Sequence, residues 1–151
     1  MSLHQKIEQD FKEAFKAGDQ ARRLVLAMLK SALLNKAIEK KSKDEPLSDE
    51  DTQNVVSIEI KKRRDAVIQY SSGGRPDLAS KEEAEVAVLI GYLPQQYAKE
   101  EIEKLAEEAI AKVGASGEKD FGKVMSVLAP LVKGRADGSL VASIVREALS
   151  R

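Results

Sequence analysis

Residues 133–138, with the sequence KGRADG, combine two basic side chains and two glycines within six positions. Gly134 follows an apolar run and is placed to end one helix in the left-handed conformation, while Asp137 precedes the next apolar stripe as an N-cap. Lys133 and Arg135 would then stand beside the unpaired amides of a helix N-terminus, which favour a phosphate. The same features occur in ordinary helix–helix connectors, so this segment alone leaves both interpretations open.

A second basic group lies at residues 61–64. Arg63 falls between Ile60 and Val67 on an apolar helical stripe, so we expect its stem to pack inward and its guanidinium to pair with a carboxylate. Glu82 and Glu85 are the candidate partners, and such pairing is a simpler interpretation than contact with nucleic acid. The remaining basic residues form a candidate secondary patch for phosphate: Lys61, Lys62 and Arg64.

No residue pattern indicates catalysis, a metal site or a cofactor. The chain has no cysteine and one histidine, His4, which we expect to be solvated near the N-terminus. These residues cannot build a thiolate site, the usual zinc site or a Ser-His triad. Acidic clusters at 82–85 and 100–103 fall in the first turns of predicted helices, where the helix dipole favours negative charge. We therefore predict no catalytic residue, no metal and no cofactor.

The composition predicts a soluble helical protein. Hydrophobic residues make up 42% of 151 residues, but aromatic residues make up only 4%, so the core must be aliphatic, as in helical bundles. No apolar run approaches the length of a membrane span, and the first residues lack a signal-peptide pattern. We expect a cytoplasmic location and no contact with a membrane.

Charge is balanced overall but not along the chain. The 25 basic and 25 acidic residues give no net charge and hence no global attraction to nucleic acid. Residues 99–120 carry four basic and seven acidic side chains, whereas residues 121–151 carry five basic and two acidic ones. The C-terminal segment is therefore locally basic. No aromatic cluster indicates a platform for base stacking, so we expect any RNA contact to involve shape and backbone.

The fold class predicted from apolar spacing is all-α, because no segment alternates with a period of two. We expect an N-terminal four-helix domain at residues 1–94 and a smaller three-helix domain at residues 95–151. Gly18 and Asp19 should separate the first two helices, and capping boxes at Ser48 and Ser80 should open the third and fourth. The expected core stripes of the first two helices include Leu3, Ile7, Phe11, Phe15, Leu24, Val25, Met28 and Leu29.

Five short motifs in a fixed order carry a family resemblance: residues 74–78, 82–85, 92–96, 120–125 and 133–138. With these motifs the chain resembles the YqeY-like family, small bacterial proteins related to the tail domain of the GatB subunit of glutamyl-tRNA(Gln) amidotransferase. The resemblance implies an all-helical protein with a small C-terminal unit similar to a tRNA-contacting module. It also implies a carbon–nitrogen ligase activity with glutamine as amide donor, for which no catalytic residue is visible here.

Three functions follow from these observations. The leading hypothesis is a non-catalytic accessory protein that contacts the tRNA backbone weakly and in a salt-sensitive manner. The alternatives are a component of a glutamine-dependent carbon–nitrogen ligase and an adaptor for an aminoacyl-tRNA synthetase or amidotransferase subunit. The expected tRNA-contacting residues are Lys123, Lys133, Gly134, Arg135, Gly138 and Arg146.

Overall fold

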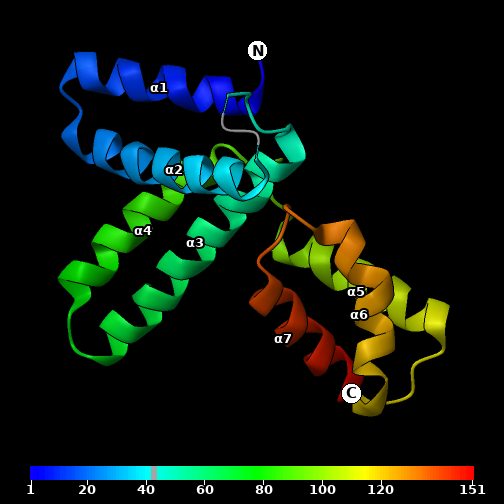
Figure 1. The fold of residues 1–151 in the computed structure, drawn as a ribbon. Helices are drawn as coiled ribbons and strands as arrows, with labels where there is room; N and C mark the ends of the chain where they lie inside the picture. Colours follow the sequence, from blue (N-terminus) through cyan, green and yellow to red (C-terminus); the bar gives the residue numbers. More distant parts are fainter. Residues whose placement is uncertain (42–43) are drawn as a thin grey trace. The chain divides into compact units, whose positions relative to one another are not determined.

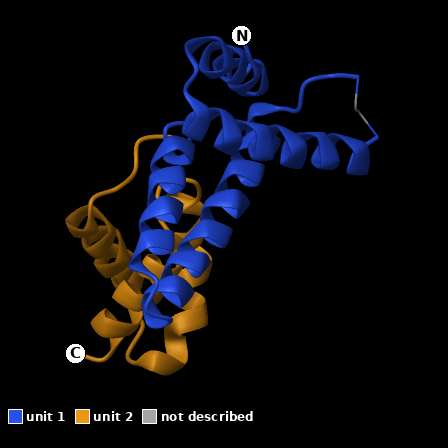
Figure 2. Cartoon of the chain, turned by 90° about the vertical axis from the view of Figure 1, so that its left-hand side faces the viewer, with its two compact units in different colours: residues 1–93 blue, residues 94–151 orange. Residues whose placement is uncertain are grey.

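The computed structural model describes residues 1–41 and 44–151, and within these ranges it contains helices and no strand. The all-α prediction is therefore confirmed. Contacts divide the chain into two compact units, residues 1–93 and residues 94–151 (Figure 2). The helices are α1 (Leu3–Ala17), α2 (Gln20–Glu39), α3 (Asp49–Ser72), α4 (Pro76–Ile90), α5 (Lys99–Val113), the short 3-10 helix η1 (Glu118–Asp120), α6 (Phe121–Val132) and α7 (Gly138–Leu149).

Local capping residues set the end of α1 and the starts of α2 and α3. Gly18 adopts the left-handed conformation with φ 71° and ends α1, as predicted. The Asp19 carboxylate accepts a hydrogen bond from the Arg22 amide at 3.2 Å, and the Ser48 hydroxyl accepts one from the Asp51 amide at 3.1 Å. Each bond satisfies an amide that has no partner inside its own helix.

The predicted start of α4 at Ser80 is wrong. The helix begins at Pro76, directly after a turn in which Gly74 has φ 73°, and Ser80 lies inside it. Proline suits the first helical position because it lacks the amide hydrogen that would stay unpaired there. Asp77 adds a negative charge to the first turn. The signal for a helix start at Pro76 therefore prevails over the capping box at Ser80.

Unit 1 consists of two helical hairpins. Helices α1 and α2 lie side by side, and the longer α3–α4 hairpin runs across them (Figure 1). The core between the hairpins is aliphatic, as its composition requires. Its largest fully buried side chains are Ile7, Leu26, Leu29, Leu33, Val56 and Leu89.

The start of α1 is tied to the start of α3. The Leu47 amide donates to Nδ1 of His4 at 2.9 Å, and the Leu3 amide donates to the Asp49 carboxylate at 2.9 Å. The His4 side chain is 14% exposed, so the expectation of a solvated terminal histidine is wrong. The segment that enters α3 passes over His4, a long-range contact that local sequence does not reveal.

A buried ionic network centred on Arg63 joins α2, α3 and α4 of unit 1. The Arg63 guanidinium donates through Nε to Glu85 at 3.2 Å, and through Nη1 to the Glu59 carboxylate at 3.3 Å and the Glu59 carbonyl at 3.0 Å. Its Nη2 atom lies 3.7 Å from the Met28 sulfur. Arg63 and Glu59 are 5% and 7% exposed. The predicted pairing with Glu85 is confirmed, and α3 is thereby linked to α4 and α2.

A second polar contact holds the end of α4. The Tyr92 hydroxyl donates to the Asp10 carboxylate at 2.7 Å, and Arg22 lies 3.7 Å from the same carboxylate. Burial, together with the negative Asp10, raises the pKa of Tyr92 well above its ordinary value, so the hydroxyl stays a donor at any physiological pH.

Unit 2 is a three-helix bundle in which α5, α6 and α7 all contact one another. Its core contains small and branched aliphatic side chains with almost no exposed surface. The fully buried members are Ile102, Ala106, Val124, Leu128, Val141 and Val145.

We predict that Arg63→Ala lowers the free energy of unfolding of the protein by about 3 kcal/mol, because Glu59 and Glu85 lose their buried cation and only the exposed Lys62 remains beside Glu59. Urea unfolding followed by circular dichroism measures this change. The control is Lys61→Ala, whose exposed pair with Asp65 should contribute less than about 0.5 kcal/mol. Equal stability of the two variants would contradict the role given to Arg63.

Candidate nucleic-acid interface

Residues 133–138 form the tight turn between α6 and α7, as the sequence predicts. Gly134 has φ 76°, a conformation that favours glycine, and the Arg135 amide donates to the Val132 carbonyl at 2.8 Å. The Asp137 carbonyl accepts from the Val141 amide at 3.0 Å, which places Asp137 at the N-cap of α7. Its carboxylate makes no cap hydrogen bond, so that part of the prediction is wrong.

The turn is fastened to the segment that precedes α5, and we call this set of contacts the clasp. It joins residues 94–97 to residues 134–135. The Tyr97 amide donates to the Arg135 carbonyl at 2.8 Å, and Nε2 of Gln96 donates to the Gly134 carbonyl at 2.8 Å. Two sequence motifs that lie about forty residues apart are therefore in direct contact within unit 2.

Arg135 supplies the side-chain half of the clasp. Its Nε donates to the Gln95 carbonyl at 2.9 Å and its Nη1 to the Tyr97 hydroxyl at 2.7 Å. The guanidinium carbon lies 3.8 Å from the centre of the Tyr97 ring. Arg135 is half-buried, and two of its donor groups bind protein atoms. These contacts hold the turn in place, and contact of Arg135 with phosphate stays a prediction.

Lys133 and Gly138 remain on the surface of the same turn. Both residues are exposed, and the first turn of α7 contains no acidic side chain, while the carboxylate of Asp137 lies at its N-cap. The combination of an exposed ammonium group with a helix N-terminus favours an anion electrostatically. Helices α6 and α7 with the turn between them form the α6–α7 hairpin, and this turn carries the first of its two basic groups.

The second basic group, Lys123 and Arg146, lies at the other end of the hairpin. Arg146, on the last turns of α7, has its guanidinium carbon 4.6 Å from the centre of the Phe121 ring at the start of α6. Lys123 is 73% exposed and lies 3.8 Å from the Asp120 carboxylate. Asp120 also accepts from the Ser116 amide, and this bond lowers its carboxyl pKa.

A helix of the length of α6 spans about 18 Å, so the predicted residues form two separate groups.

The secondary patch on α3 is partly neutralised by acidic neighbours. Lys61 lies 3.4 Å from Asp65, and Lys62 lies 3.1 Å from Glu59. Both lysines are exposed, while Arg64 is half-buried. These pairings weaken, on electrostatic grounds, the attraction of the patch for phosphate.

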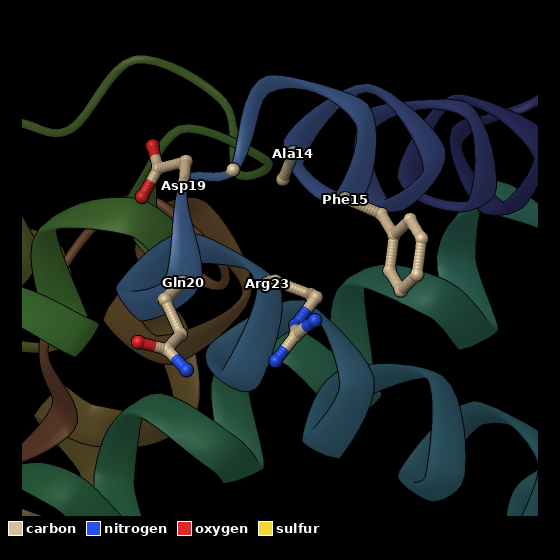
Figure 3. Close-up of a pocket in the computed structure, with 6 residues that line it drawn as sticks. Ala14, Phe15, Asp19, Gln20 and Arg23 are labelled. Carbon is tan, nitrogen blue, oxygen red and sulfur yellow. The ribbon is translucent and has the colours of Figure 1, made fainter.

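A small hollow of about 200 Å³ lies at the α1–α2 turn of unit 1 (Figure 3). Phe15 and Arg23 line this hollow, with the guanidinium carbon 5.3 Å from the centre of the ring. Phe15 is 60% exposed, so its predicted place in the core is wrong. Ala14 is buried at that level of α1 instead, because the tight turn after Gly18 brings α2 close.

The outer face of α2 is apolar and exposed. Leu24 and Met28 were predicted to be core residues, but each is more than half exposed, as are Leu34 and Ile38. The buried face uses other apolar positions of the same helix. They are Val25, Leu26, Leu29, Leu33 and Ala37. A helix that is apolar on both faces is typical of one that has a further packing partner.

The described residues contain neither a metal-ligand cluster nor a membrane-spanning helix. No group of three or more histidine, aspartate or glutamate side chains in residues 1–41 and 44–151 could hold a metal ion. Within the same ranges, no helix has the length and apolar character needed to cross a membrane.

Together these features define a class of protein: all-helical, with two compact units, the second a three-helix bundle that carries an exposed basic hairpin. The chain belongs to the family described as Yqey-like protein, which it matches over residues 4–149. The resemblance drawn from the five motifs is thereby confirmed for this family. The relation to the GatB tail stays a prediction.

Three relatives share the name altered inheritance of mitochondria protein 41, mitochondrial. The protein from Eremothecium gossypii is 29% identical over 87 residues, 58% of this chain and 46% of its own length. The protein from Lachancea thermotolerans is 30% identical over 89 residues, 59% and 46% of the two lengths. For Vanderwaltozyma polyspora the values are 29% over 126 residues, 78% and 66%. The chain thus spans about half the length of the first two relatives.

We predict that Arg135→Ala opens the clasp and destabilises it by about 2 kcal/mol, because two hydrogen bonds and one cation–π contact are lost. Hydrogen exchange of the Tyr97 amide, which donates to the Arg135 carbonyl, should accelerate. Lys133→Ala serves as a neighbouring control that should leave this exchange rate unchanged. If Arg135→Ala also leaves it unchanged, the clasp does not depend on this side chain.

Proposed function

We propose that this protein is a non-catalytic accessory protein that contacts the backbone of tRNA through its C-terminal unit. The observation that carries the proposal is the α6–α7 hairpin, whose basic residues Lys133, Lys123 and Arg146 are exposed. Residues 121–151 carry five basic and two acidic side chains, so the local charge favours phosphate.

The clasp gives Arg135 a positioning role in this function. It fixes the turn that presents Lys133 and the first amides of α7, with Gly134 in the left-handed conformation that the turn needs. Pre-arranged contacts lose less entropy on binding than contacts on a free loop. With only about three phosphate contacts, the affinity should be modest and should fall steeply with salt.

The finer parts of the proposal rest on the sequence resemblance. Similarity to the GatB tail supports tRNA, rather than another nucleic acid, as the ligand, and an aminoacyl-tRNA synthetase or amidotransferase subunit as a protein partner. A cytoplasmic location belongs to the proposal, although the names of the three relatives include the word mitochondrial. A role in a glutamine-dependent carbon–nitrogen ligase stays an untested alternative.

The expected consequence is that the double variant Lys123→Ala/Lys133→Ala binds tRNA more weakly and with a smaller salt dependence. The slope of log affinity against log salt should fall in magnitude by about 1.5, since each phosphate contact contributes roughly 0.7–0.9. Fluorescence anisotropy over a salt series measures both quantities.

The matched control for this experiment removes two lysines from α5, in the acidic part of the same unit. Lys104→Ala/Lys112→Ala changes the net charge by the same amount, and both lysines are exposed. The control should keep nearly all of the affinity. Undiminished binding by Lys123→Ala/Lys133→Ala would exclude the hairpin as the RNA-contacting surface.

A second candidate function, that of a protein adaptor, is favoured by the outer face of α2. Four large apolar side chains on this helix are each more than half exposed: Leu24, Met28, Leu34 and Ile38. Apolar side chains that line one helix face are a common way to dock a partner protein.

If the adaptor function is correct, Leu24→Glu/Leu34→Glu should abolish co-purification with a synthetase or amidotransferase subunit in ribonuclease-treated extracts, because two charges enter the apolar contact. Quantitative mass spectrometry of the purified complexes measures the loss. Ala84→Glu/Ala87→Glu on α4 adds the same charge at exposed positions and should change nothing. Association that disappears with ribonuclease alone would favour the RNA function instead.

A further inference from the structure

Basic side chains lie over most of the aromatic rings in this protein. The chain has three phenylalanines and three tyrosines, and four of these six rings have an arginine or lysine over the face. Two of the pairs are in unit 2, one at each end of the α6–α7 hairpin. They are Arg135 over Tyr97 and Arg146 over Phe121.

The two pairs in unit 2 differ in what else the arginine contacts. Arg135 is half-buried and donates to Gln95 and Tyr97, so its guanidinium serves the fold. Arg146 is exposed, and its guanidinium lies over the Phe121 ring and makes no hydrogen bond or ion pair with any residue that the structure describes. Its five N–H donors are therefore not used by any described residue.

The surroundings of Arg146 keep its charge available. The neighbouring acid on α7, Glu147, lies 3.6 Å from Arg151 and is thus engaged by another cation. Phe121 is half-buried and packs against the core of unit 2, so the ring is a fixed support for the guanidinium. An arginine held over a ring loses less side-chain entropy on binding than one that moves freely in solvent.

Planar cations of this kind serve as stacking surfaces for bases. In RNA recognition, unpaired bases stack on aromatic rings and on arginine guanidinium planes, and these contacts tolerate any base because each has a π-face. The guanidinium carbon of Arg146 lies 4.6 Å from the centre of the Phe121 ring, and Arg146 is exposed. The ring thus supports the guanidinium from within the protein, while the exposed side chain remains accessible to a ligand from solvent.

We propose that Arg146 and Phe121 form a stacking platform for an unpaired RNA base. This inference rests on the proposed RNA-binding function and names its ligand class more closely: structured RNA with a single-stranded loop beside the contacted backbone. Lys123 lies on the first turn of α6, two residues after Phe121, and is 73% exposed, so it offers a nearby positive charge. The platform adds selectivity that phosphate contacts alone lack.

The decisive variant is Arg146→Lys, which keeps the positive charge but removes the planar guanidinium. Two RNA probes of equal length are compared, a hairpin with a single-stranded loop and a blunt duplex. We expect the full-length wild-type protein to prefer the hairpin by about tenfold, the size of one stacked base. Arg146→Lys should lose this preference while its affinity for the duplex and its salt dependence stay the same.

A spectroscopic measurement tests stacking independently of affinity. A fluorescent adenine analogue in the hairpin loop should change its emission when wild-type protein binds, and not when Arg146→Lys binds at saturating concentration. Circular dichroism confirms that the variant is folded, as expected for an exposed residue. Lys119→Ala, which removes an exposed cation before α6, is the control and should keep both the preference and the emission change.

The outcomes separate this inference from the proposed function. A hairpin preference that Arg146→Lys retains overturns the platform. Equal binding of both probes by the wild-type protein also overturns it, but leaves backbone contact by the α6–α7 hairpin in place. No binding of either probe overturns the proposed function and the platform together.

Discussion

The turn between α6 and α7 of unit 2 depends on one set of polar contacts, the clasp between residues 94–97 and residues 134–135. A three-helix bundle of this size has a small core, and the buried side chains here are mostly alanine, valine and leucine. Such a core positions the helices but does not fix the turn between α6 and α7. The Arg135 side chain does so, because its hydrogen bonds and its ring contact engage the segment before α5. The exposed groups of the turn are therefore held by a residue that is itself half-buried.

Helical spacing predicted the fold class because each helix has at least one strong apolar stripe, but it did not always identify the buried face. Helix α2 is apolar on two faces, so Leu24 and Leu26 are equally good core residues by spacing alone. The choice between them is made by the packing of α1 and α3, which the sequence of α2 does not contain. The start of α4 illustrates a different limit. Two valid start signals compete there, and Pro76 after a left-handed glycine precedes Ser80.

Local sequence patterns predicted which basic residues belong to the candidate site, but not which residues they contact. Lys133, Arg135 and Arg146 were identified as surface cations from local patterns, and all three lie on the α6–α7 hairpin or its turn. The partners of the two arginines are distant in the sequence: Tyr97 is 38 positions from Arg135, and Phe121 is 25 positions from Arg146. Without those partners the aromatic residues appear scattered, which explains why no stacking surface was expected. The ring contacts arise only when α5, α6 and α7 pack together.

The charge balance of the chain determines what kind of recognition such a surface can support. A protein with 25 basic and 25 acidic residues generates little long-range attraction for RNA, so the encounter is not steered from a distance. Screening in physiological salt confines each exposed lysine to about 8 Å of influence. The binding free energy must then come from short-range contacts that are already in position. Each such contact has to contribute more binding free energy than an isolated charge does. An arginine supported by an aromatic ring meets this condition, because the same side chain offers a charge to phosphate and a plane to a base.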